Sequence, residues 1–335
     1  MTQTWFEQLF GFPEGDYEAT RARFALDGEA LVSRANGRRF GVGRFETPSL
    51  ASLRDRTLHA RPGALRVTHE VTGDVLELHA RPENEGALFQ VASQLNCLEF
   101  ADPRDVPEDG VTQYAMDPTQ GPACSLAAGA ATVYRNYFAP VEGRAGQTRD
   151  RQIENLAGVQ AALGEAGGLV EVRNGYTFST PEKLRALGEA LAAADRDALM
   201  GALRVGLQTG VEVTFATRFT PPDAPRRVSQ AFCSALSCGY ASGSLALWRP
   251  LATLVLDAAY EATLRCALLD AEEREGSGKV WLTFLGGGAF GNAPAWIASA
   301  IGRALARFRD RDLDVRIAHH RALDADLVRA IDAML

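Results

Sequence analysis

The amino-acid sequence predicts a globular protein of the α/β class with a β-rich part at its N-terminal end. Turn and hairpin patterns dominate the chain before Arg81, helical patterns alternate with short apolar strands after it, and 46% of the 335 residues are hydrophobic. Alternating helices and apolar strands are typical of layered α/β structures, and this hydrophobic content supports a packed core. Because no repeat or low-complexity linker divides the chain, we expect residues 81–335 to form the main domain, with residues 1–80 packed on it as a β-rich extension.

The N-terminal extension contains turn patterns between runs that alternate in polarity. Asp-Gly at 27–28, Asn-Gly at 36–37 and Thr-Gly-Asp at 72–74 each predict a β-hairpin. Thr-Pro-Ser at 47–49 precedes a short helical pattern and predicts a capped helix between the hairpins.

Helices are predicted where apolar residues recur at spacings of three and four. The predicted helices span residues 121–137, 149–166, 181–205, 248–271, 294–308 and 324–335. Short apolar runs predict strands at 89–95, 168–172, 211–216, 228–232, 279–285 and 313–318.

Composition and charge argue against several classes of function. A net charge of -7 and an isoelectric point near 5.4 disfavour binding to nucleic acid, which relies on clustered Lys and Arg. No apolar run reaches the roughly 20 residues that a membrane helix needs, and the N-terminal segment lacks the pattern of a secretory signal. The five cysteines are scattered without a C-x-x-C motif, which disfavours a zinc site or a disulfide framework. We therefore expect a cytoplasmic protein that binds no metal, no nucleic acid and no membrane.

A polar loop runs directly into the helix predicted from residue 121. Asp117, Thr119 and Gln120 stand just before Gly121 and Pro122, and Pro is favoured in the first turn of a helix. A helix start presents unpaired backbone N–H groups and the positive end of the helix dipole, so it can bind phosphate or carboxylate. The alternative, a capped helix that binds nothing, fits this stretch equally well.

A glycine-rich loop connects the strand predicted at 279–285 to the helix that begins at Pro294. Its residues are Gly286, Gly287, Gly288, Ala289, Phe290, Gly291 and Asn292. A strand, a glycine-rich turn and a helix together bring backbone N–H groups within reach of a diphosphate. The loop has neither the lysine of G-x-x-x-x-G-K-[ST] nor the spacing of G-x-G-x-x-G, which disfavours a P-loop and a dinucleotide fingerprint. An ordinary glycine turn is the alternative.

A third polar cluster follows the strand predicted at 89–95. Gln94, Asn96 and Glu99 fall at its end, the edge at which α/β proteins bind ligands. The alternative is that Gln94 and Asn96 satisfy buried backbone groups.

The candidate nucleophiles have no suitable partners. Cys233 and Cys238 lie in a stretch without histidine, which disfavours a thiol nucleophile. His319 and His320 end a predicted strand, and no histidine pairs with a Ser or Cys in a recognisable triad. We expect these histidines to be structural.

Two sets of motifs resemble known families. The segment GGGAFGN after an apolar strand is similar to the second phosphate-binding loop of macrodomains, in particular to G-C-G-A-F-G-G of poly(ADP-ribose) glycohydrolases. The segments ASQLNCLEF, GVTQY, DPTQGPAC, TVYRNYF, QTRDRQIENL and NGY, in this order, resemble the MavL-type macrodomain proteins. The resemblance extends from about Gly43 to about Phe308.

This resemblance implies both a fold and a function. The fold is a three-layer α/β/α macrodomain, with a mixed sheet, that holds ADP-ribose. The function is that of an ADP-ribosylhydrolase, which removes ADP-ribose from a modified protein side chain, arginine in the MavL-type case. ADP-ribose is then the ligand or product, no cofactor is required, and the partner is an ADP-ribosylated protein. The paired glutamates of G-G-G-V-x-G-x-x-x-Q-E-E are absent and D-P-T-Q-G-P stands in their neighbourhood, so activity on poly(ADP-ribose) chains is not implied.

The same resemblance implies contacts with the ligand. Gly286 to Asn292 would enclose the diphosphate and the distal ribose, and Asn96 would lie near that ribose. The helix start, with Thr119 and Gly121, would add N–H donors to the diphosphate.

Cleavage of an ADP-ribosyl bond resembles glycoside hydrolysis, in which one carboxyl protonates or orients the leaving group and another activates water. We assign Glu99 and Asp117 to these roles and Gln120 to a supporting hydrogen bond, with Asp102 or Asp109 as substitutes. Two alternatives remain: an ADP-ribose reader without a working carboxylate, and a hydrolase of another NAD-derived nucleotide.

Overall fold

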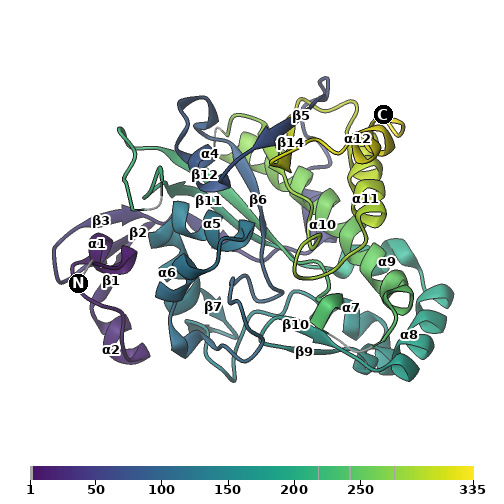
Figure 1. Cartoon of the computed structure of the whole chain (residues 1–335), viewed down its shortest axis with the longest axis horizontal. Helices are drawn as coiled ribbons and strands as arrows, with labels where there is room; N and C mark the ends of the chain where they lie inside the picture. The colour runs from purple at the N-terminus through teal and green to yellow at the C-terminus, as the bar shows by residue number, and fades with distance from the viewer. Residues whose placement is uncertain (1–2, 218, 241–242, 275) are drawn as a thin grey trace.

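A seven-stranded mixed sheet forms the centre of the computed structural model, which describes residues 3–217, 219–240, 243–274 and 276–335 (Figure 1). In spatial order its strands are β4 Arg44–Glu46, β11 Gly206–Glu212, β12 Arg227–Cys233, β6 Leu88–Ala92, β13 Lys279–Leu282, β14 Asp314–His320 and β5 Arg66–Thr72. β11 runs antiparallel to both of its neighbours, and the pairings from β12 across to β5 are parallel. The carboxyl ends of five neighbouring strands therefore meet at one edge of the sheet.

Helices cover both faces of this sheet (Figure 1). One face carries α3 Leu50–Arg56, α8 Pro181–Ala193, α9 Arg196–Ala202, α10 Leu245–Glu273, α11 Pro294–Arg307 and α12 Ala325–Asp332, and the other carries α4 Val75–Ala80, α5 Gln120–Ala127 and α6 Gly129–Tyr137. Successive side chains of β6 enter opposite cores, Leu88 with α10 and Phe89 with α4 and α6. The three-layer α/β/α fold expected from the sequence is confirmed.

The N-terminal residues form a small sheet and two helices. The helices are α1 Trp5–Phe10 and α2 Tyr17–Ala22, and β1 Phe24–Asp27, β2 Ala30–Ser33 and β3 Arg39–Gly41 pair antiparallel. The hairpins predicted at 27–28 and 36–37 are confirmed, as is the capped helix α3, in which Ser49 Oγ accepts from Ser52 N at 3.2 Å.

Two strands from the first 80 residues, β4 and β5, belong to the main sheet rather than to the small one. The division of the chain into an extension and a main domain at residue 80 stays a prediction. The hairpin predicted at 72–74 is wrong, because Asp74 Oδ1 accepts from Leu76 N at 3.0 Å and starts α4 instead.

The helix predicted at 121–137 is divided into α5 and α6 at Ala128. A residue distant in sequence causes the break: Thr214 N donates to Ala127 O at 2.7 Å, and Thr214 Oγ1 accepts from Gly129 N at 2.9 Å. These bonds satisfy backbone groups that a continuous helix would have paired internally.

The helix predicted at 181–205 is also two helices, because Asp195 caps α9 by accepting from Asp197 N and Ala198 N. In the segment predicted as helix at 149–166, residues 149–156 are not helical, and α7 Ala157–Ala162 and the 3-10 helix η4 Gly164–Leu169 follow.

Two predicted strands are shifted. Only residues 211–212 of the strand predicted at 211–216 belong to β11, which begins earlier, at Gly206. The strand predicted at 168–172 overlaps β9 Glu171–Arg173, which pairs with β10 Tyr176–Phe178 outside the main sheet. The remaining predicted elements correspond to β6, β12, β13, β14, α10, α11 and α12.

Short elements complete the chain. They are β7 Pro140–Val141, β8 Arg144–Ala145 and the 3-10 helices η1 Pro82–Asn84, η2 Pro107–Asp109, η3 Thr112–Met116 and η5 Cys238–Tyr240. No helix among the described residues is both long and apolar enough to cross a membrane.

Candidate functional site

A cavity of about 910 Å³ lies at the carboxyl ends of the parallel strands. Residues that follow or end β5, β14, β13, β6 and β12 line it: Thr72, Gly73, His320, Arg321, Thr283, Phe284, Ala92, Ser93, Cys233 and Ala235. This edge is where open α/β sheets bind ligands. Its volume falls in the range of small-molecule sites.

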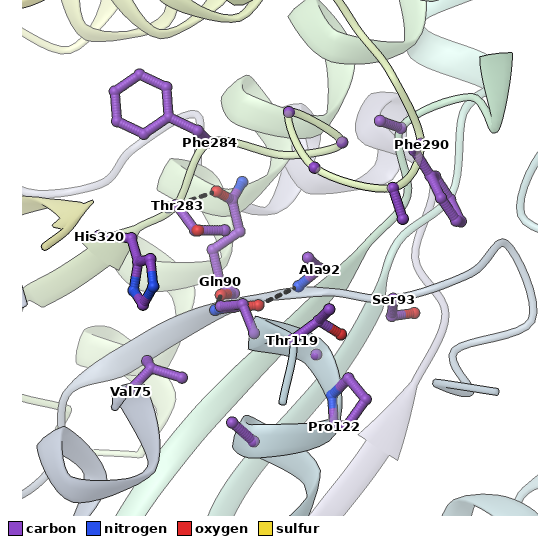
Figure 2. Close-up of a pocket in the computed structure, with 18 of the residues that line it drawn as sticks. Val75, Gln90, Ala92, Ser93, Thr119, Pro122, Thr283, Phe284, Phe290 and His320 are labelled. Atoms are coloured by element: carbon purple, nitrogen blue, oxygen red, sulfur yellow. Dashed lines mark hydrogen bonds between the residues drawn. The ribbon is translucent and has the colours of Figure 1, made fainter. Parts of the chain in front are cut away.

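The cavity gathers most of the predicted site residues. Its lining includes Glu99, Asp117, Thr119, Gln120, Gly121, Gly286, Gly287, Gly288, Ala289 and Phe290. Figure 2 shows Phe290 on the glycine-rich loop, and Phe284 just before that loop, opposite Thr119 and Pro122 at the start of α5. Asn96, Gly291 and Asn292 are not among the lining residues.

The first end of the glycine-rich loop is fixed by buried polar side chains. Tyr260 of α10 donates its hydroxyl to Thr283 O at 2.7 Å and accepts from Leu285 N at 2.9 Å. Gln90 Oε1 of β6 accepts from Thr283 N at 3.2 Å (Figure 2). The entry to the loop is thereby tied to both the sheet and the central helix.

Asn292 fixes the second end of the loop. Its side chain is buried, and Nδ2 donates to Leu236 O at 2.8 Å while its backbone N donates to Gly286 O at 2.9 Å. Asn292 thus anchors the loop, and its predicted contact with the ligand stays a prediction. The sequence contained no sign of this role, because Leu236 lies far away in the chain.

The tip of the loop keeps its backbone donors unpaired. Among the described residues, the N–H groups of Gly288, Ala289 and Phe290 donate no hydrogen bond, and the first two residues are exposed. Consecutive N–H groups that face a cavity form a site for an anion such as phosphate.

Gln120 joins the start of α5 to β6. Its Oε1 accepts from Ala92 N at 2.7 Å and its Nε2 donates to Gln90 O at 2.8 Å (Figure 2). Gly121 is required beside it, since a Cβ there would collide with Ala92 O. The amide of Gln120 therefore holds the helix against the strand, while the catalytic support predicted for it stays a prediction.

Glu99 lies at the inner wall of the cavity and is buried. Its Oε2 accepts from Ser125 Oγ at 2.6 Å and from Arg135 Nη2 at 3.1 Å, and both side chains of the ion pair are 0% exposed. Among the described residues, Oε1 has no hydrogen-bond partner. Burial raises the pKa of Glu99, although Arg135 and Ser125 act in the opposite direction. A buried carboxyl with a raised pKa and one unpartnered oxygen is suited to holding a proton.

Asp117 lies on the rim of the cavity and is partly exposed. Its Oδ1 accepts from Thr119 N at 2.8 Å, which shapes the entry to α5. The pKa of Tyr176 is raised chiefly by burial, and also by Tyr240 and by the carboxylates of Asp105, Asp102 and Asp117. Of these carboxylates, Asp117 is the one that lines the cavity.

An aromatic cluster that sequence reasoning missed lies beside the glycine-rich loop. The rings of Tyr176 and Phe290 are 5.4 Å apart, and Tyr240 lies 5.1 Å from Tyr176 and 5.9 Å from Phe290. All three residues line the cavity. The turn Asn174-Gly175, with φ of 49° and 77°, brings Tyr176 to this place. This Asn-Gly pair is the sequence pattern that could have predicted the turn.

Asn96 lies behind the cavity wall, and both polar atoms of its amide are engaged. Oδ1 accepts from Leu98 N at 3.0 Å, and Nδ2 donates to Gln152 Oε1 at 2.8 Å. Gln94 likewise bonds to both backbone groups of Phe100. Both side chains bond to buried backbone groups, as in the alternative stated for them. The predicted contact of Asn96 with a ribose stays a prediction.

The substitute carboxylates are occupied outside the cavity lining. Asp102 forms an ion pair with Arg104 at 2.7 Å, and Asp109 Oδ2 accepts from Val106 N at 2.9 Å. Within the described part of the chain, no group of three or more His, Cys, Asp or Glu side chains is arranged to hold a metal ion.

Comparison with known proteins gives distant similarities. No family model and no curated protein matches the chain. Among solved structures, it is similar to poly(ADP-ribose) glycohydrolase from Deinococcus radiodurans in complex with ADP-ribose, with 15% identity, a TM-score of 0.46, and coverage of 88% of this chain and 94% of that chain. The same enzyme from Thermomonospora curvata, bound to the inhibitor ADP-HPD, has 14% identity, a TM-score of 0.42, and coverage of 95% and 96%. At such low identities and scores, the function has to be derived from this chain's own residues.

Proposed function

We propose that the protein is an ADP-ribosylhydrolase of the macrodomain type, which releases ADP-ribose from a modified protein side chain. One observation carries this proposal: Gly288 to Phe290 and Glu99 line the same cavity, and among the described residues the three loop N–H groups and Glu99 Oε1 have no hydrogen-bond partner. One cavity thus contains both donors for a diphosphate and a carboxyl that can protonate the leaving atom. The motif resemblance of the glycine-rich loop supports the same ligand.

Binding would rest on the glycine-rich loop. The diphosphate would accept hydrogen bonds from the backbone of Gly288, Ala289 and Phe290, at the edge where the strand ends concentrate donors. The ring of Phe290, backed by Tyr176 and Tyr240, would contact a ribose or base face.

Chemistry would follow the two-carboxyl scheme of glycoside hydrolysis. Glu99, whose pKa is raised by burial, would give its proton to the leaving atom as the bond to the anomeric carbon of the distal ribose breaks. Asp117 would accept a proton from the water whose oxygen forms the new bond to that carbon.

Arginine is the modified residue that we propose, by the MavL-type resemblance and by the charge of the rim. The carboxylate of Asp117 lines the cavity at this rim, so a cationic leaving group would be favoured beside it. Glutamate-linked ADP-ribose lacks such a cation.

A non-catalytic ADP-ribose reader is the second candidate, because Glu99 forms a fully buried ion pair with Arg135. Buried pairs of this kind often serve structure alone. A reader would bind ADP-ribose through the same loop and release nothing.

Calorimetric titration with ADP-ribose tests the binding half. A Cβ added at Gly288 would meet no atom within 4 Å, so Gly288→Glu should fold normally and place a negative charge against the diphosphate. We expect the wild type to bind, Gly288→Glu to lose binding, and the uncharged Gly288→Gln to bind more weakly than the wild type. Absence of binding by the wild type would overturn the proposal.

Release assays separate the enzyme from the reader. Peptides carrying arginine-, glutamate- or serine-linked ADP-ribose are incubated with the wild type, and free ADP-ribose is measured. Preferential release from arginine supports the proposed substrate, whereas tight binding without release from any peptide supports the reader. If another NAD-derived nucleotide occupied the site at a lower concentration than ADP-ribose needs, the protein would instead be a hydrolase of that nucleotide.

A further inference from the structure

The segment from residue 107 to 117, called the 107–117 segment below, is held in place by a carboxylate from the start of the chain. Glu14 Oε1 accepts from Val111 N at 2.9 Å and from Tyr137 Oη at 2.7 Å, and Glu14 Oε2 accepts from Thr112 N at 2.6 Å. The 3-10 helix η3 begins at Thr112 and Val111 precedes it, so one carboxylate accepts from the two backbone donors at the start of η3. Hydrogen bonds to a charged acceptor are stronger than neutral ones.

The backbone around this contact is shaped for it. Gly110 has a φ of 79°, and a Cβ at this position would lie 2.5 Å from Glu14 Cδ. A second N-terminal residue reinforces the same place, because Trp5 Nε1 donates to Thr112 O at 2.9 Å. Trp5 is 1% exposed, so this bond is sheltered from water.

The other end of the segment is reached from α2. Tyr17 Oη donates to Asn136 O at 3.1 Å, and Asn136 Nδ2 donates to Pro107 O at 2.9 Å. The N-terminal residues therefore support the 107–117 segment both near its start and at η3.

The 107–117 segment contains one of the two candidate catalytic carboxylates, Asp117, and contacts the backbone of the other, Glu99. Tyr114 Oη, in the middle of η3, accepts from Glu99 N at 2.9 Å, and Asp117 follows the end of η3 directly. Any movement of η3 relative to the sheet would therefore displace Asp117 and loosen the backbone of Glu99 together. The glycine-rich loop, in contrast, is anchored by Tyr260 and Asn292, while the bonds of Glu14 go to η3 and α6.

We propose that Glu14 is a positioning residue, which sets the catalytic geometry by fixing η3 and leaves the binding of ADP-ribose to the glycine-rich loop. This inference rests on the proposed function. It gives the N-terminal residues a role in turnover rather than in the choice of ligand.

The test compares the wild type with Glu14→Gln and Tyr137→Phe. Glu14→Gln turns one acceptor oxygen into an N–H₂ donor that faces a backbone N–H, so one donor at the start of η3 loses its acceptor. Tyr137→Phe removes the hydroxyl that shares the same carboxylate and leaves both backbone bonds intact. Turnover of arginine-linked substrate, the Kd for ADP-ribose, and hydrogen exchange of the amides from 111 to 117 are measured for each protein.

Glu14→Gln should lower kcat by about 10- to 100-fold, since small misplacements of catalytic groups have effects of this size, while the Kd for ADP-ribose stays within about threefold. Exchange from 111 to 117 should become faster in Glu14→Gln. Tyr137→Phe should keep kcat within about twofold of the wild type, because the bonds to η3 survive. Unchanged kcat in Glu14→Gln, or equal losses of kcat and ADP-ribose affinity, would overturn the proposal.

The exchange measurement keeps this inference separate from the proposed function. If the wild type releases ADP-ribose from no substrate, the proposed function is wrong, and so is the role of Glu14 in turnover. Hydrogen exchange tests the contact between Glu14 and η3 independently, because wild-type exchange rates in Glu14→Gln would show that this carboxylate does not hold η3.

Discussion

Asp117 combines a structural bond with a place on the cavity rim, and the two can be separated by one substitution. Its Oδ1 accepts from Thr119 N, a bond that an asparagine side chain can also accept. The negative charge, which the proposed activation of water needs, is lost in Asp117→Asn.

Asp117→Asn should therefore keep the fold and the affinity for ADP-ribose while turnover falls by about 10²- to 10⁴-fold, the usual contribution of a general base. Release of ADP-ribose and thermal unfolding are measured side by side. Asp117→Ala, which also removes the acceptor for Thr119 N, serves as the comparison for structural loss. Full turnover in Asp117→Asn would remove this residue from the mechanism.

At the scale of elements, the glycine-rich loop is constrained at one position and open at another. Gly286 has a φ of 70°, and a Cβ there would collide with Ala235 Cβ, whereas the region around Gly288 is open. A side chain at Gly286 is thus both conformationally and sterically unfavourable.

Gly286→Ala should lower the free energy of unfolding by about 1 kcal/mol or more, and Gly288→Ala by much less. Chemical denaturation of both variants measures the difference. Since the two substitutions add the same methyl group to the same loop, equal stabilities would show that the backbone of Gly286 is not constrained as described.

Sequence patterns predicted the elements that present the site but not the direction of every side chain. The glycine run and the Gly-Pro helix start identified the loop and α5, because both depend on local backbone preferences. Asn96 and Asn292 bond to Gln152 and Leu236 instead of lining the cavity, and these partners are remote in sequence and invisible to local patterns. The division of the predicted helix near residue 128 has the same origin, a contact from residue 214.

The stability of the whole molecule should depend on pH through two carboxyls, one half-buried and one buried. Burial raises the pKa of Glu154 from its ordinary value of 4.5 to about 7, and that of Asp270 from 3.8 to about 6. At pH values between the ordinary and the raised pKa, the folded protein keeps protons that the unfolded chain releases. The free energy of unfolding therefore falls as pH rises from about 4 to about 7 and becomes level above that range.

Glu154→Gln should remove part of this dependence. Its amide oxygen can still accept from Leu156 N, as Glu154 Oε1 does at 3.0 Å, without a charge to bury. We expect the variant to be more stable than the wild type by about 2–3 kcal/mol at pH 8 and equally stable near pH 4.5. Denaturant titrations at the two pH values test this, with the exposed Glu165→Gln as a control that should match the wild type at both. A destabilised Glu154→Gln at pH 8 would contradict the burial argument.

The order of strands in the main sheet also bears on how the chain is made. β6 lies between β12 and β13, which are synthesised long after it, and the edge strand β5 pairs Arg66 with Asp314 of β14. Contacts between segments so remote in sequence form slowly, because long loops must close first. An emerging chain would therefore hold β6 without a partner until β12 was made and β5 without a partner until β14 was made, so both strands should depend on protection until those later segments appear.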